Sequence, residues 1–83
     1  MPTVMRIGPY RFFFYSNEGH EPRHIHIRSG DGEAKFWLEP VQFEASWKYN
    51  ERELKKIERH IQDNLSYLIE LWDEFFEGSS DDE

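Results

Sequence analysis

Short runs typical of β-strands fill the first half of the chain: residues 3–7 are rich in β-branched side chains, residues 10–16 are aromatic, and residues 24–29 and 41–47 alternate between apolar and polar. Alternation with a period of two is typical of β-strands that bury one face. Two turn signals, Gly8-Pro9 and Gly30-Asp31-Gly32, separate such runs. The pattern predicts strands over residues 3–7, 10–16, 24–29 and 33–39, and either a fifth strand or an extended cover over residues 41–47. Together these runs predict an antiparallel β-meander of four to five strands.

From Asn50 onward the apolar residues recur with the period of a helix. Asn50 can cap the first turn, and Glu53 three residues later completes a capping-box pattern. The apolar positions between residues 54 and 76 fall in one stripe about 160° wide, which predicts a long C-terminal amphipathic helix and an α+β fold. Such a helix would be about 40 Å long, whereas a chain of this size folds to about 30 Å across. Two alternatives stay open: a break near Asp63-Asn64, or a projecting apolar end that needs a partner.

Length and composition predict one domain that folds without covalent links. We expect a single α+β domain over residues 1–77 and a flexible acidic tail over residues 78–83. The chain has no cysteine, which excludes disulfides, thiolate metal sites and a cysteine nucleophile, and which suits a reducing cytoplasm. The longest apolar run near the N-terminus, residues 12–15, is too short for a signal peptide or a membrane span. We therefore expect a cytoplasmic protein without a membrane partner.

Charge is distributed unevenly along the chain. The net charge is −7, yet residues 1–40 hold five basic and five acidic side chains, whereas residues 41–83 hold five basic and twelve acidic ones. An acidic protein is a poor non-specific binder of nucleic acid. Four of the five basic residues of the first part lie between Arg11 and Lys35, together with three histidines. This clustering is compatible with a local basic site on an otherwise acidic protein.

Strand parity gathers these polar residues on one face of the sheet. Residues two apart on a strand share a face, so core positions for Ile25 and Ile27 place their histidine neighbours on the opposite, outer face, toward water. The outer face predicted from three strands carries Arg11, Phe13, Tyr15, His24, His26, Arg28, Lys35 and Trp37. Cations beside aromatic rings are typical of surfaces that bind single-stranded RNA.

The first of three interpretations of the outer face is a metal-independent endoribonuclease. His24 and His26 would act as base and acid, with Arg23 and Arg28 holding the phosphate. The side chains that this interpretation assigns to catalysis are His24, His26, Arg28 and Tyr15, with Glu18 in reserve, and those assigned to binding are Arg11, Arg23, Lys35 and Trp37. It requires no cofactor.

The other two interpretations are a metal site and a structural role. A His-x-His pair on one strand face is a common half-site for zinc, nickel or iron, and His20 or Glu33 would add a ligand to His24 and His26. No spacing identifies the third ligand. In the third interpretation the histidines bond to loop carbonyls or contact another protein, which is the commonest role of such clusters.

Several motifs of the chain resemble those of a known family. They are HIHIRSGDGEAKFWLEPV over residues 24–41, FFFYSNE over residues 12–18 and WDEFF over residues 72–76. In these motifs, and over nearly its full length, the chain resembles a small bacterial family described as domain of unknown function 4160. The resemblance implies a stand-alone bacterial protein that forms the toxin-like half of a two-gene toxin–antitoxin pair. It brings no catalytic residue, and its shared histidine strand corresponds to His24 and His26.

Residues and resemblance together predict a toxin-like component that acts on RNA through the outer face. Its expected partner is a protein from an adjacent gene or a second copy of the chain. The alternatives are a non-enzymatic, antitoxin-like interaction module and a small metal-binding protein. Whether the chain is an enzyme at all stays open at this point.

Overall fold

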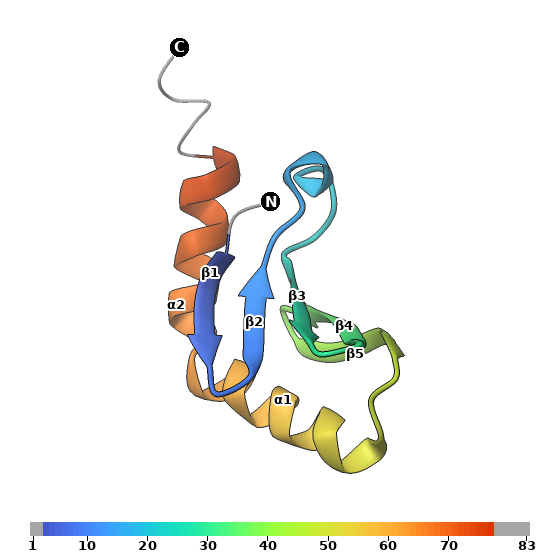
Figure 1. Cartoon of the computed structure of the whole chain (residues 1–83). Coiled ribbons are helices and arrows are strands. Elements are labelled where there is room, and N and C mark those ends of the chain that lie inside the picture. Colours follow the sequence, from blue (N-terminus) through green and yellow to red (C-terminus); the bar gives the residue numbers. More distant parts are fainter. Residues whose placement is uncertain (1–2, 78–83) are drawn as a thin grey trace.

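A computed structural model describes residues 3–77, so the tail predicted over residues 78–83 lies outside the described residues. Five strands form one antiparallel sheet whose spatial order follows the chain (Figure 1). They are β1 (Thr3–Ile7), β2 (Tyr10–Phe13), β3 (His24–Ser29), β4 (Gly32–Leu38) and β5 (Val41–Trp47). The predicted meander and its fifth strand are confirmed. Within residues 3–77, no helix combines the length and apolar character needed to cross a bilayer.

The predicted helix is broken into two parts. The helical elements are α1 (Glu51–Asp63), α2 (Leu65–Trp72) and a π-helical turn, η2 (Asp73–Glu77). Helix α1 begins at the predicted cap, where the Oδ1 of Asn50 accepts a hydrogen bond from the Glu53 backbone N–H at 2.8 Å. At Asn64 φ is −121° and ψ is 21°, outside the helical range, so α1 and α2 run in different directions (Figure 1). The break near Asp63-Asn64 is therefore the correct alternative.

The pleat of the sheet decides which side chains meet the helices. Phe12 lies opposite Ile27, Ile25 opposite Phe36, and Ile27 opposite Ala34, so these side chains share one face. The core that they form with the helices contains Phe12, Ile25, Ile27, Ala34, Phe36, Leu38, Ile57, Ile61 and Leu68, all at most 1% exposed. The prediction that the two isoleucines of β3 point into the core is thus confirmed.

The opposite face of β3 is covered as well, which corrects one expectation. His24 is 0% exposed and His26 6%, so the expectation that the two imidazoles point toward water is wrong. The cover at this end of the sheet comes from a short 3-10 helix, η1 (Ser16–Glu18), and from Trp72, whose ring lies 4.9 Å from that of His24. Both faces of the strand are buried because these two segments, far apart in the sequence, close over its first residues.

Candidate functional site

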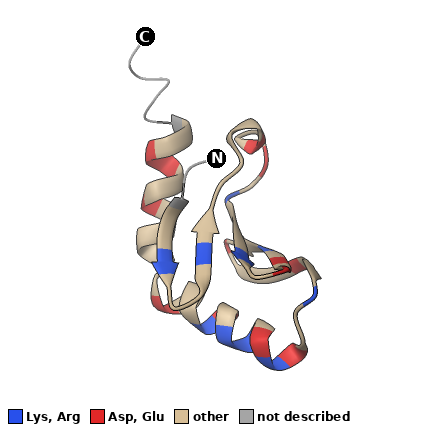
Figure 2. Cartoon of the chain, viewed as in Figure 1, with Lys and Arg blue, Asp and Glu red and all other residues tan. Residues whose placement is uncertain are grey.

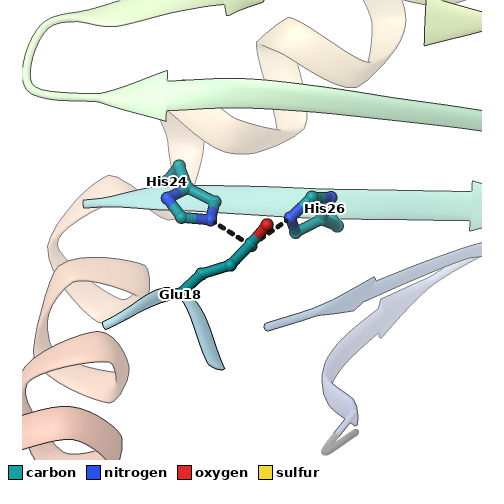
Figure 3. A group of neighbouring side chains, drawn as sticks. All are labelled: Glu18, His24 and His26. Atoms are coloured by element: carbon teal, nitrogen blue, oxygen red, sulfur yellow. Dashed lines mark hydrogen bonds and ion pairs between the residues drawn. The ribbon is translucent and has the colours of Figure 1, made fainter. Parts of the chain in front are cut away.

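The carboxylate of Glu18 lies between the imidazole rings of His24 and His26 (Figure 3). The Oε1 atom of Glu18 is 2.7 Å from Nε2 of His24 and 2.8 Å from Nε2 of His26. Both histidines project from the same face of β3 because they are two residues apart, and η1 brings Glu18 over them. We call these three residues the Glu18 cluster; one ligand atom from each lies within 4.8 Å of the others.

The other ring nitrogen of His24 fixes the orientation of its imidazole. Nδ1 lies 2.9 Å from the carbonyl oxygen of Pro22. A carbonyl can only accept a hydrogen bond, so Nδ1 carries a proton. Nε2 then needs either its own proton or one on Glu18 to make the 2.7 Å contact with the carboxylate. Histidines that bind metals show the same arrangement, with the remote nitrogen donating to a backbone carbonyl and the near nitrogen facing the ion.

Aromatic rings enclose both imidazoles. The ring of His24 makes edge contacts with Trp37 at 5.6 Å and with Trp72 at 4.9 Å. The ring of His26 stacks on Phe13 at 5.5 Å and meets Tyr15 edge-on at 4.5 Å. Packing on this scale leaves each imidazole little rotational freedom and keeps bulk water away from it.

Burial and hydrogen bonding act in opposite directions on the protonation of the Glu18 cluster. Burial alone would raise the pKa of Glu18, but the hydrogen bonds and charges of His24 and His26 outweigh it and lower that pKa below its ordinary value. Burial lowers the pKa of His26, although the contact with Glu18 opposes this shift. An ionised carboxylate beside a neutral imidazole is the donor combination that a metal cation binds.

The remaining outer-face residues lie where strand parity predicts them. Cross-strand partners on this face are Arg11 with Arg28, Phe13 with His26, His26 with Lys35, and His24 with Trp37. The guanidinium of Arg11 lies over Phe13 at 4.7 Å, and the ammonium of Lys35 over Trp37 at 4.6 Å. The predicted combination of cations and rings is therefore present on one face.

Carboxylates neutralise most of these cations. Arg28 pairs with Glu33 at 2.8 Å, and Lys35 pairs with Glu21 at 2.8 Å. Arg23, the predicted phosphate clamp, bridges two acidic residues of other elements, Asp73 at 2.6 Å and Glu39 at 3.0 Å. Arg23 thus ties the start of β3 to the helical end of the chain, and its charge is used within the fold.

The two residues predicted from the sequence as a third metal ligand, His20 and Glu33, do not lie beside His24 and His26. His20 is exposed, and Glu33 is engaged by Arg28 and by the hydroxyl of Tyr15 at 3.1 Å. Neither belongs to the Glu18 cluster. Sequence spacing cannot identify Glu18 as the partner, because its position depends on how η1 folds back over β3. The only available signal was its place in the loop that leads into the histidine strand.

Comparison with known proteins gives one match. The family model described as Domain of unknown function (DUF4160) matches residues 10–73, which run from the start of β2 to the first residue of η2 and include the Glu18 cluster. No curated protein and no solved structure matches the chain. Because the match covers well over half of its length, the chain belongs to the family described as Domain of unknown function (DUF4160).

Proposed function

We propose that this protein binds one transition-metal ion through Glu18, His24 and His26. The observation that carries the proposal is the convergence of two imidazole nitrogens on one carboxylate oxygen, at 2.7 and 2.8 Å, with the remote nitrogen of His24 anchored to the Pro22 carbonyl. This replaces the sequence-based expectation of a protein without a cofactor. It takes up the metal alternative with Glu18 in place of His20 or Glu33.

The distances within the Glu18 cluster are close to those that a metal ion needs. Imidazole nitrogen and carboxylate oxygen bind zinc at about 2.1 Å, so neighbouring ligand atoms lie roughly 3.0 to 3.4 Å apart around the ion. The present separations of 2.7 and 2.8 Å would have to grow by only a few tenths of an ångström. All three ligand atoms lie within 4.8 Å of one another, and a cation that replaces the proton between His24 and Glu18 would also have to bring the two imidazole nitrogens to about 3.4 Å.

The donor set indicates which metals fit. Two imidazoles and one carboxylate, without thiolate, suit zinc or ferrous iron and leave coordination positions for exogenous ligands. When side-chain atoms alone are considered, Glu18 is the most exposed of the three residues at 22%, whereas His24 is 0% exposed and His26 8%. An exchangeable ligand would therefore approach from the side of η1.

Action on RNA is a second hypothesis, which the family resemblance motivates. It is weakened by two features of the structure: the buried rings of His24 and His26, and the carboxylate partners of Arg23, Arg28 and Lys35. Metal-independent cleavage of RNA by the wild-type protein, lost in the His24→Ala, His26→Ala double variant, would favour this hypothesis over the metal proposal. A role as one half of a toxin–antitoxin pair stays a prediction.

The metal proposal is tested by titration of untagged, metal-free protein with zinc and, under anaerobic conditions, with ferrous iron. We expect one ion per chain, with a release of protons that depends on buffer and pH because the ion displaces protons from the ligands. Glu18→Gln keeps the size of the side chain but removes its charge, and should weaken binding by at least ten-fold. His20→Ala, an exposed histidine of the same loop, should bind as the wild type does.

Two controls make the outcome decisive. Circular dichroism of metal-free Glu18→Gln establishes whether the variant is folded; if it is not, Glu18→Asp, which retains the charge but shortens the reach, takes its place. Thermal unfolding with excess metal should shift upward for the wild type and for His20→Ala only. Folded wild-type protein that binds neither metal at millimolar concentration, or binding that survives in folded Glu18→Gln, overturns the proposal.

A further inference from the structure

A groove with one cationic wall lies between α1 and the turn that joins β1 to β2. Its volume is about 600 Å³, and Pro9 and Tyr10 contribute apolar surface to it. The cationic wall consists of Arg52, Lys55, Lys56 and Arg59, all exposed side chains of α1. Figure 2 shows basic positions of α1 beside this turn, away from the loop that joins β2 to β3 in Figure 1.

The spacing of the four cations is unfavourable for the helix itself. Residues 52, 55, 56 and 59 are separated by three or four positions, so each side chain has a like charge as its neighbour on the same helix face. Acidic residues also occur at these spacings, Glu51 and Glu58 beside Lys55 and Asp63 beside Arg59, and they offset only part of the repulsion. Like charges at this spacing destabilise a helix. Within residues 3–77, Arg23, Arg28 and Lys35 pair with carboxylates, whereas no ion pair joins the four cations of α1 to an acidic side chain. A bound anion would neutralise the repulsion along α1.

We propose that this groove binds a small phosphorylated ligand with a flat apolar part, of the size of a nucleotide. Its volume lies within the roughly 300 to 1,000 Å³ that small-molecule sites occupy. The guanidinium groups of Arg52 and Arg59 can each hold a phosphate through two hydrogen bonds, and the lysines between them add compact positive charge. The exposed ring of Pro9 and the partly exposed side chain of Ile7 provide the contact for the apolar part, whereas Tyr10 is buried behind them at 5% exposed.

The charge of the rest of the protein favours a compact ligand over a long polyanion. The whole chain carries −7, so everything outside these four cations carries −11 (−7 minus 4). The cationic row extends about 10 Å along the helix, close to the distance of about 8 Å over which physiological salt screens charge. A nucleic-acid strand would extend past the row into repulsive surroundings, whereas a nucleotide ends within it.

The test is a titration followed by two-dimensional NMR of the 15N-labelled, full-length protein, with ADP, adenosine, inorganic phosphate, a ten-nucleotide single strand and an acidic peptide as probes. We expect ADP to bind most tightly and to perturb the amides of Tyr10 and of residues 52–60. Adenosine and phosphate alone should each bind at least ten-fold more weakly. Tighter binding of the strand or of the acidic peptide than of ADP overturns the ligand class.

Two single-charge variants provide the matched comparison. Arg52→Gln should weaken ADP binding at least five-fold. Arg6→Gln removes the same charge from an exposed residue of β1. Arg6 lies opposite Arg11 in the β1–β2 register, on the face of the sheet away from α1, so this variant should leave the affinity unchanged. No saturable ADP binding up to millimolar concentration, or equal effects of the two variants, contradicts the site. The ADP titration is then repeated with folded Glu18→Gln. Equal ADP affinity of this variant and the wild type means that the groove does not depend on the Glu18 cluster, so the test of the groove is separate from that of the metal proposal.

Discussion

Glu18 determines the chemistry of the histidine strand. Its single oxygen atom Oε1 satisfies the Nε2 atoms of both imidazoles, at 2.7 and 2.8 Å. A polar group buried without a partner costs about 1 to 3 kcal/mol, so two nearly buried rings on one strand require such an acceptor. The same contacts that stabilise the fold thus assemble the donor atoms of the proposed metal site. At the scale of the residue, structural and functional roles of Glu18 are not separate.

Acid should destabilise the protein in two stages. Burial lowers the pKa of His26 below 6.5, so the folded protein favours the neutral imidazole more than the unfolded chain does. The stability that follows is fully present above pH 6.5 and is lost as the pH falls through the lower folded pKa. Lys35 lowers the pKa of Glu21 by hydrogen bonding, and for Glu33 the bonds from Arg28 and Tyr15 outweigh burial, which alone would raise it. The stability that these carboxylates provide is present above pH 4.5 and is lost as the pH falls through their lower folded pKa values.

The measurement is the melting temperature of metal-free protein by circular dichroism between pH 8 and pH 3. We expect a decline that begins below about pH 6.5 and steepens below about pH 4.5. Glu33→Gln should flatten the lower part of the curve and leave the upper part unchanged. A melting temperature that stays constant from pH 7 to pH 4 would refute this assignment.

At the scale of elements, the end of the helical region holds the loop before β3 in place. Phe76 of η2 packs on Trp72, with ring centroids 4.1 Å apart, and on Phe14 at 5.9 Å. The loop reaches the same aromatic group through Gly19, where an added Cβ would lie 2.5 Å from Cδ1 of Phe76. Gly19 is needed there for its small size, since its φ of −66° is open to any residue.

Gly19→Ala should therefore loosen the cover of the Glu18 cluster. The extra methyl group must displace a packed aromatic ring, and overpacking of this kind costs about 1 to 3 kcal/mol. Urea unfolding measures the loss of stability, and metal titration measures the expected weaker binding. Ser16→Ala, an exposed position of the same loop, is the control and should change neither quantity. Equal behaviour of the two variants would mean that η2 does not restrain the loop.

At the scale of the whole molecule, the two proposed sites should act independently. The Glu18 cluster lies at the start of β3, whereas the cationic groove lies at the turn between β1 and β2. Figure 1 shows the start of β3 and this turn in separate parts of the sheet. Sites without shared contacts usually contribute additively. We expect the affinity for ADP to change less than two-fold when zinc is bound, as measured by calorimetry on metal-free and zinc-loaded protein. A change of ten-fold or more would reveal coupling through the sheet.

The fold could be predicted in outline because its pattern is local. Alternation together with β-branched and aromatic residues predicted four strands, with the fifth left open as a strand or an extended cover, and Asn50 predicted the start of α1. The predicted end of the second strand at residue 16 is wrong, because β2 ends at Phe13 and η1 begins at Ser16. The break at Asn64 stayed one of two alternatives, since it depends on packing against distant elements. The side chain of Asn64 donates a hydrogen bond to the His60 carbonyl oxygen at 2.9 Å, and this local bond competes with continuation of the helix. From the sequence, the main reason to expect a break was that an unbroken helix would be longer than the folded chain is wide.

By itself the sequence determined which residues share a face, because the pleat of a strand alternates strictly: His24 and His26 had to lie opposite Ile25 and Ile27. Only the tertiary structure decided that this second face is buried and that Glu18 is the acceptor for both imidazoles. The physical reason is distance along the chain. Trp72, about fifty residues away, encloses His24, and no local period encodes a contact between segments that meet only after the sheet and helices have packed.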